Sequence, residues 1–282
     1  MLEACVLWPR KGSFALFRTS NSTVSVLNAL IASRGLITTE DADAFLRTCG
    51  SHSPRTRDRA LAALCASGEL VRVQRGLYAR KRRELGGPDP YLLASHLACD
   101  AVLGLRTALE VRGVVVPNTA RCIYFTRLAG TSRNPVWCGT RMQRISHPVA
   151  LVRTRREFEE TEMVDGHDGG QMRVATTERA FVDVLDRPRL TGDWPMVLQV
   201  LDAIAALDLD RVIHYVTCLD NATTAAKVGW FLERHPERFG LTLAVLCRLE
   251  RMRPRGPHYL SRSQRVSGRY VARWNLVVPP TL

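Results

Sequence analysis

The 282-residue sequence predicts an α+β protein, in which an N-terminal winged helix-turn-helix is followed by a larger C-terminal domain of mixed helices and strands. Three observations support this fold class. Three short helical patterns precede a hairpin pattern, helix and strand patterns then follow one another to the C-terminus, and apolar residues make up 46% of the chain, enough for two modest cores. The expected organisation is an N-terminal extension at 1–22, the winged helix-turn-helix at 23–83, a linker at 84–89 and the C-terminal domain at 90–282.

Basic residues are in excess, and the excess is uneven. Lys and Arg number 40 against 27 Asp and Glu, which gives a net charge of +13 and a pI near 10.0. Residues 1–83 carry 14 of the basic residues and only 6 of the acidic ones. A strongly basic segment indicates a polyanionic partner, and double-stranded DNA is the partner that a winged helix-turn-helix would bind.

Export, membrane insertion and disulfide bonding are not expected. No apolar run approaches the roughly 18 to 20 residues that span a bilayer, and residues 1–20 lack the pattern of a signal peptide, so we expect a cytoplasmic protein. The cysteines are spread singly, without a C-x-x-C pair, and predict small buried thiols rather than disulfides or a structural metal site. They are Cys5, Cys49, Cys65, Cys99, Cys122, Cys138, Cys218 and Cys247.

The first two helices of the N-terminal region are predicted from spacing and caps. Residues 23–34 form a helical pattern that ends at Gly35, a residue suited to the left-handed position after a helix. Thr38 is positioned to cap a second helix, whose first turn holds Glu40 and Asp41 near the positive end of the helix dipole. The residues predicted to face the core are Val24, Leu27, Leu30, Ile31, Ala42, Phe45 and Leu46.

The third helix has the clearest boundaries. Ser53 is the expected N-cap, Pro54 occupies the first helical position and Gly68 follows the last turn. At 100° per residue its two faces differ in chemistry. Leu61, Leu64 and Cys65 form the apolar face, and Arg55, Thr56 and Arg59 lie opposite.

A hairpin with a basic tip follows. Val71 and Val73 alternate with Arg72 and Gln74, a turn falls at Arg75-Gly76, and Leu77 and Tyr78 resume the strand. Helices followed by such a hairpin are typical of a winged helix-turn-helix, in which the third helix enters the major groove and the wing contacts the flanking backbone.

The residue types at these positions suit DNA. Arginine can contact guanine or clamp a phosphate, Thr and Gln can address base edges or phosphate oxygens, and a helix N-terminus offers free amides to an anionic oxygen. The basic run at residues 80–83 would either track a phosphate backbone or serve as a solubilising hinge. The predicted DNA-contacting residues are Arg55, Thr56, Arg57, Arg59, Arg72, Gln74, Arg75, Arg80, Lys81, Arg82 and Arg83.

The C-terminal region mixes helices and strands. Two helical patterns lie within residues 90–112, and a helix with a threonine cap precedes Pro188. RCIYFT and ALVRTRR are predicted strands, VDGHDGGQMRVA a hairpin, most of residues 194–252 helical, and RYVARWNLVV a final strand.

Enzyme chemistry is not supported by the motifs present. The acidic run EFEETE, with Glu157, Glu159, Glu160 and Glu162, alternates as an exposed strand does and favours a solvated face over a metal site. Glu178 and Asp183 lie about 140° apart on one helix, which fits capping or an ion pair rather than a shared metal. The remaining candidates are turn residues (Asp165, His167, Asp168), a core or boundary histidine (His214) and a helical lysine (Lys227). No P-loop, H-E-x-x-H or G-x-S-x-G pattern occurs, so we expect no catalytic residues, no metal and no cofactor.

Five segments in order carry a family resemblance: RGLYAR, LGLRTALEVRG, VATTERAFVDVLDRP, KVGWFLER and RWNLVVP. Across roughly residues 23–280 the chain resembles the AbiEi antitoxins of type IV toxin-antitoxin and phage abortive-infection systems. The resemblance implies a transcriptional repressor that binds repeats in its own promoter, and a C-terminal domain that counteracts a neighbouring nucleotidyltransferase-like toxin. In this type of system the antitoxin and the toxin need not form a stable complex. It places the DNA-reading helix at 54–67 and the wing at 71–80, and leaves the first twenty residues without a counterpart.

Other functions remain open at this stage. The C-terminal region could instead bind a toxin or another partner directly, with the basic region only assisting. A further hypothesis is that the protein is a general winged-helix regulator that acts without a toxin. The sequence predicts no membrane partner.

Overall fold

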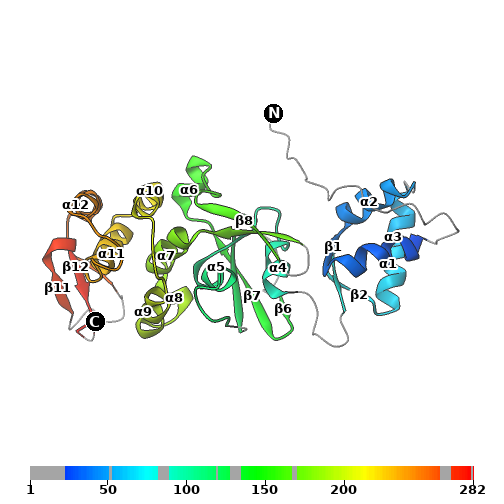
Figure 1. Cartoon of the computed structure of the whole chain (residues 1–282), viewed down its shortest axis with the longest axis horizontal. Helices are drawn as coiled ribbons and strands as arrows, with labels where there is room; N and C mark the ends of the chain where they lie inside the picture. The colour runs from blue at the N-terminus through cyan, green and yellow to red at the C-terminus, as the bar shows by residue number, and fades with distance from the viewer. Residues whose placement is uncertain are drawn as a thin grey trace. The chain divides into compact units, whose positions relative to one another are not determined.

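The computed structural model describes residues 23–50, 53–81, 89–118, 120–127, 135–166, 170–260, 268–280 and 282. The chain divides into two units, residues 1–87 and residues 88–282. Figure 1 shows the elements of each. The predicted extension at 1–22 and most of the predicted linker lie outside the described residues.

The N-terminal unit contains three helices and a small antiparallel sheet, which confirms the winged helix-turn-helix part of the predicted fold class (Figure 1). Its sheet has the order β1-β3-β2. The short strand β1 pairs with β3 and was not predicted. In chain order the elements are α1 (Thr23–Ser33), β1 (Leu36–Thr38), α2 (Thr39–Thr48), α3 (Pro54–Ala66), β2 (Leu70–Gln74) and β3 (Leu77–Arg80).

The predicted caps are mostly confirmed. Thr38 and Asp41 form a reciprocal capping box, with the Asp41 amide donating to Thr38 Oγ1 at 3.0 Å and the Thr38 amide donating to Asp41 Oδ2 at 2.9 Å. Pro54 begins α3 as predicted, and Gly68 follows it with φ +78°, but the Ser53 side chain makes no cap hydrogen bond. The prediction for Gly35 is wrong, because Gly35 has no positive φ and lies directly before β1, where its carbonyl accepts from the Arg80 amide at 2.9 Å.

The C-terminal unit is built on a mixed six-stranded sheet of order β6-β7-β5-β4-β9-β8. Strand β5 pairs parallel with β7 and antiparallel with β4, and β8 and β9 form the predicted hairpin. The sheet and its helices are α4 (Pro90–Ser95), β4 (Val102–Leu103), α5 (Leu105–Val111), β5 (Arg121–Thr126), β6 (Val136–Trp137), β7 (Thr140–Ser146), α6 (Val149–Thr154), β8 (Thr161–Asp165) and β9 (Gln171–Ala175).

Helix α7 (Thr177–Asp186) joins this sheet to a helical half, since it packs against α5 near the sheet and against α10 and α11 beyond it (Figure 1). Thr176 caps α7 as predicted, accepting from the Arg179 amide at 3.2 Å. The remaining elements are α8 (Pro188–Thr191), α9 (Trp194–Asp202), α10 (Leu209–Leu219), α11 (Ala222–Glu233), α12 (Leu243–Met252), β10 (His258–Tyr259), β11 (Arg269–Val271), a 3₁₀ turn (Ala272–Trp274) and β12 (Leu276–Val278).

Two predicted strands are wrong. ALVRTRR forms helix α6, because a short apolar run does not distinguish a strand from a helix and β7 takes the place in the sheet. RYVARWNLVV is a hairpin of β11 and β12 rather than one strand. The fully buried Trp274 ends a 3₁₀ turn, and Asn275 with φ +49° reverses the chain there.

The structure also tests the predictions about the cysteines and about membrane insertion. All seven cysteines within the described residues are free. The prediction of small buried thiols is wrong for Cys49, Cys99 and Cys138, which are exposed. Polar neighbours and turn positions place these three at the surface. None of the helices within the described residues combines the length and the hydrophobicity that a membrane span requires.

The buried side chain of His147 makes the stability of the C-terminal unit depend on pH. Its ring is 2% exposed and stacks on Phe125 with 5.5 Å between ring centroids. Burial, assisted by the Arg179 charge, lowers the pKa of His147 from 6.5 to about 4. Because the folded pKa lies below the unfolded one, the stability that neutral His147 contributes is complete above pH 6.5 and is lost as the pH falls toward 4.

Replacing His147 by phenylalanine should remove that dependence. We expect the free energy of unfolding of His147→Phe, relative to the wild type, to rise by about 2 kcal/mol between pH 7 and pH 4.5. Urea unfolding at the two pH values measures the difference. A difference that stays constant with pH would show that His147 is as easily protonated in the folded chain as in the unfolded one.

Candidate nucleic-acid interface

Helix α3 presents one apolar and one polar face. Ala60, Leu61 and Leu64 are buried against the core of the unit. Arg55 and Arg59 are exposed, four residues apart on the opposite face, and Thr56 beside them is half-buried. The first two turns of α3 therefore carry two solvent-exposed arginines on the same face of the helix.

Arg57 is held within the protein. Its guanidinium pairs with Asp43 of α2 and donates to Asp58 Oδ1 from Nε at 2.9 Å and from Nη2 at 2.7 Å. The hydrogen bond that Arg57 donates to Asp58, together with both carboxylate charges, raises the pKa of Arg57 above its usual value. Its side chain is only 15% exposed. Arg57 thus joins α3 to α2, which fixes the angle between the two helices.

The wing is a tight hairpin joined to α2. Gln74 and Leu77 pair across the Arg75-Gly76 turn, where Gly76 has φ +80°. The Gly76 carbonyl accepts the Thr39 amide at 2.9 Å, which joins the turn at the tip of the wing to the start of α2. Strand β2 also packs against α3, so the wing and the third helix are held in one small unit.

The basic residues of the wing differ in their surroundings. Arg72, Arg75 and Lys81 are exposed, and Gln74 is half-buried. Arg80 is half-buried and its Nη1 donates to the Ala32 carbonyl at 3.4 Å. Arg82 and Arg83 lie outside the described residues. Of the predicted DNA-contacting cations that the structure describes, Arg55, Arg59, Arg72, Arg75 and Lys81 are thus exposed.

Asp43, Asp58 and Thr39 are the residues that the sequence reasoning missed around this surface. Asp43 lies fourteen residues before Arg57, so no local pattern pairs them. Asp58 follows Arg57 directly, and its carboxylate was a visible signal for an ion pair on the helix surface.

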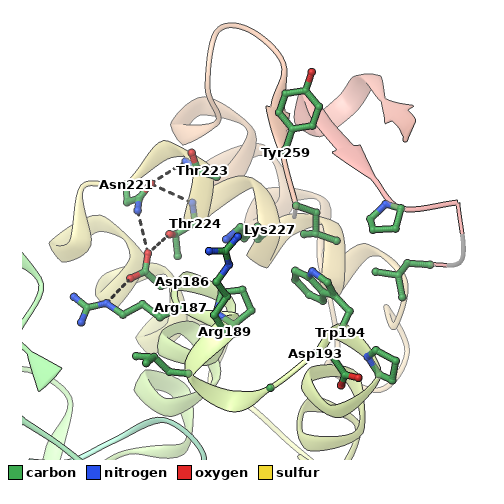
Figure 2. Close-up of a pocket in the computed structure, with 17 residues that line it drawn as sticks. Asp186, Arg187, Arg189, Asp193, Trp194, Asn221, Thr223, Thr224, Lys227 and Tyr259 are labelled. Atoms are coloured by element: carbon green, nitrogen blue, oxygen red, sulfur yellow. Dashed lines mark hydrogen bonds and ion pairs between the residues drawn. The ribbon is translucent and has the colours of Figure 1, made fainter. Parts of the chain in front are cut away.

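The C-terminal unit holds a cavity of about 990 Å³, shown in Figure 2. Asp186 on its wall accepts hydrogen bonds from Thr224 Oγ1 at 2.5 Å and Asn221 Nδ2 at 3.0 Å (Figure 2). Lys227 is buried, and its Nζ donates to the Leu185 carbonyl at 3.0 Å. Acidic, basic and aromatic side chains line the cavity together, so its charge favours no one ligand class.

The acidic candidates of the C-terminal unit are paired with basic side chains. The prediction that EFEETE is an exposed strand with a solvated acidic face is wrong, because residues 157–160 form a turn and the strand begins only at Thr161. Glu157 is buried, with Arg127 at 3.2 Å. The other pairs are Glu159 with His214 at 2.9 Å, Glu160 with Arg211 at 2.6 Å and Glu162 with Arg112 at 2.9 Å.

Glu178 and Asp183 have separate partners, as predicted. Glu178 accepts the Asp208 amide at 3.2 Å, and Asp183 pairs with Arg179 at 3.4 Å and accepts from Tyr215 Oη at 2.8 Å. Asp165 accepts from Gln171 Nε2 at 3.1 Å, while His167 and Asp168 lie outside the described residues.

The comparison with known families finds a match within the N-terminal unit. Residues 25–81 match the family model described as "Transcriptional regulator, AbiEi antitoxin". These residues are therefore similar to the AbiEi antitoxins, and they are called the AbiEi domain below. The match runs from the third residue of α1 to the end of the wing, so it covers α3 and the hairpin completely. A DNA-binding regulator role follows from this family, whose members are typically non-enzymatic.

The fold beyond the AbiEi domain also has a solved counterpart. The crystal structure of the RV2827C protein from Mycobacterium tuberculosis is similar with a TM-score of 0.56 and 18% identity, over 93% of this chain and 92% of that one. At this identity the likeness shows the fold alone. No curated protein sequence matches the chain significantly.

Proposed function

We propose that the protein is a transcriptional autorepressor that binds double-stranded DNA in its own promoter, at repeated sites, through the AbiEi domain. The observation that carries the proposal is the exposed pair Arg55 and Arg59 on the first turns of α3, beside a wing with a basic tip. In this proposal residues 23–83 are the DNA-binding domain, residues 84–89 the linker and residues 90–282 the antitoxin domain, and the protein acts in the cytoplasm.

The contacts divide into two classes. We assign base reading in the major groove to Arg55, Thr56 and Arg59, because helix α3 offers them together on one face. The second class is contact with the phosphate backbone, which also sets the salt dependence of binding. Its members are Arg72, Gln74, Arg75, Arg80, Lys81, Arg82 and Arg83. Arg57 acts in this scheme by holding α3 against α2.

The C-terminal unit is proposed to supply the antitoxin activity against a nucleotidyltransferase-like toxin. Two observations support this proposal. The family that matches residues 25–81 is described as an antitoxin family, and the five segments that resemble AbiEi antitoxins follow in the same order across roughly residues 23–280. Direct binding of a toxin or another partner through the C-terminal unit is the second candidate function. The paired carboxylates described above support a structural or interaction role for this unit more than a hydrolytic one.

A promoter fusion tests autorepression in cells. The region upstream of the gene drives a reporter, and the protein is supplied from a separate inducible plasmid. We expect expression of the wild type to lower reporter output, and expression of Arg55→Ala/Arg59→Ala at equal protein level to leave it high. Repression by both proteins alike would show that α3 does not select the promoter.

Co-expression with a neighbouring nucleotidyltransferase-like gene product tests the antitoxin part. We expect growth to be rescued by the full chain, without a complex that co-purifies in high salt. A tight one-to-one complex that survives high salt would favour the interaction module instead.

A further inference from the structure

Helix α10 places a histidine and a cysteine on one face. His214 and Cys218 are four residues apart, which aligns their side chains along the helix surface. His214 Nε2 lies 3.7 Å from Cys218 Sγ. Glu159, in the turn before β8, brings its Oε1 to 2.9 Å from the same His214 Nε2. All three ligand atoms lie within 4.8 Å of one another.

Thiolate, imidazole and carboxylate are the three ligand types that Zn²⁺ takes in proteins. With zinc-to-ligand distances of about 2.0 to 2.3 Å, tetrahedral geometry separates ligand atoms by roughly 3.3 to 3.8 Å. The distance between His214 and Cys218 already falls in this range. Glu159 and His214 are 31% and 46% exposed, so rotation of either side chain can widen their contact without disturbing the core.

The neighbouring arginines leave Glu159, His214 and Cys218 able to coordinate a metal ion. Arg211 pairs with Glu160 and Glu162, so its charge is directed at the neighbouring carboxylates rather than at Glu159. Arg156 is exposed, and its Nη1 lies 3.2 Å from Cys218 Sγ. The same N–H group can continue to donate to a metal-bound sulfur.

We propose that Glu159, His214 and Cys218 form a Zn²⁺ site in the C-terminal unit, with the fourth coordination position open to water. Exposure of His214 places that position at the surface. The site would tie the turn that carries Glu159 to α10, which is 55 residues further along the chain. It is separate from the residues proposed to contact DNA and does not depend on that proposal.

Cobalt provides the direct test, because Co²⁺ takes the ligands of Zn²⁺ and a Co²⁺–thiolate bond has a charge-transfer band in the near ultraviolet. The full-length protein is stripped with a chelator, reduced and titrated with Co²⁺. We expect one Co²⁺ per chain with the thiolate band, and loss of the band when Zn²⁺ is added. A wild-type protein without the band would overturn the proposal.

Matched variants assign the ligands. Cys218→Ser and His214→Ala should each abolish the band, and Glu159→Gln should weaken Zn²⁺ affinity by about tenfold or more in competition with a chromogenic chelator. Cys247→Ser is the control, since Cys247 is a half-buried thiol of α12 outside the cluster. His214 is exposed, so His214→Ala keeps the test decisive should Cys218→Ser fold poorly. A band that survives either α10 variant, or that is lost in Cys247→Ser, would place the metal elsewhere.

Discussion

Arg55→Ala/Arg59→Ala is expected to remove most of the preference of the protein for its own promoter. Both side chains are exposed on one face of α3, and neither forms an ion pair within the described residues. An arginine that contacts a base edge contributes about 1 to 3 kcal/mol of discrimination, so each loss should lower the ratio of specific to nonspecific affinity between about fivefold and 150-fold. Fluorescence anisotropy with native and shuffled duplexes measures this ratio.

Arg248→Ala is the matched control for that variant. Arg248 is an exposed arginine of the C-terminal unit that pairs with Asp210 at 2.8 Å, so its loss removes a positive charge at a residue that is not among the proposed DNA contacts. We expect it to leave the ratio unchanged. Equal weakening of native and shuffled duplexes by the α3 variant would mean that Arg55 and Arg59 contact phosphates and that the bases are read elsewhere.

Among the variants considered, Arg179→Met should lower the free energy of unfolding the most. Arg179 is fully buried, and its Nη1 donates to the carbonyl oxygens of Glu157 at 2.8 Å and Glu159 at 2.6 Å. Its Nε lies 3.4 Å from Asp183 Oδ2. Burial raises the pKa of Asp183 to about 6, even with the guanidinium beside it. The variant leaves two carbonyls without their donor and a buried carboxylate without its counter-ion, which costs about 3 to 5 kcal/mol.

Chemical unfolding measures this loss, and a double variant provides the comparison. Arg179→Met/Asp183→Leu should recover part of the lost stability, because the second change removes the uncompensated buried charge. Arg248→Ala should change the free energy of unfolding by about 0.5 kcal/mol or less, as an exposed ion pair does. A loss of under about 1 kcal/mol in Arg179→Met would show that water replaces the guanidinium.

Local signals in the sequence predict much of the N-terminal unit. The Thr38 cap of α2, the proline that begins α3 and Gly68 after its end depend on neighbours within a few residues, and all three are present. Strand β1 is absent from the prediction because three residues carry no periodicity, and only pairing with β3 makes them a strand.

The errors and omissions have a common cause in long-range contacts. Arg57 is a predicted DNA contact that stays a prediction, but its ion pair with Asp43 is an omission, because it depends on how α2 packs on α3. Glu157 was expected in a solvated face, but the fold brings Arg127 from another strand end to it. The spacing of His214 and Cys218 was visible along α10, whereas the approach of Glu159 required the tertiary structure.

Binding of the full-length protein to the duplex upstream of its own gene, against a shuffled duplex of the same length, tests autorepression most directly. Fluorescence anisotropy at ~0.15 M salt and again at lower salt separates sequence preference from charge attraction. The account predicts a preference of about two orders of magnitude or more for the native duplex at the higher salt. Equal and salt-sensitive binding to both duplexes, or none to either, would contradict it.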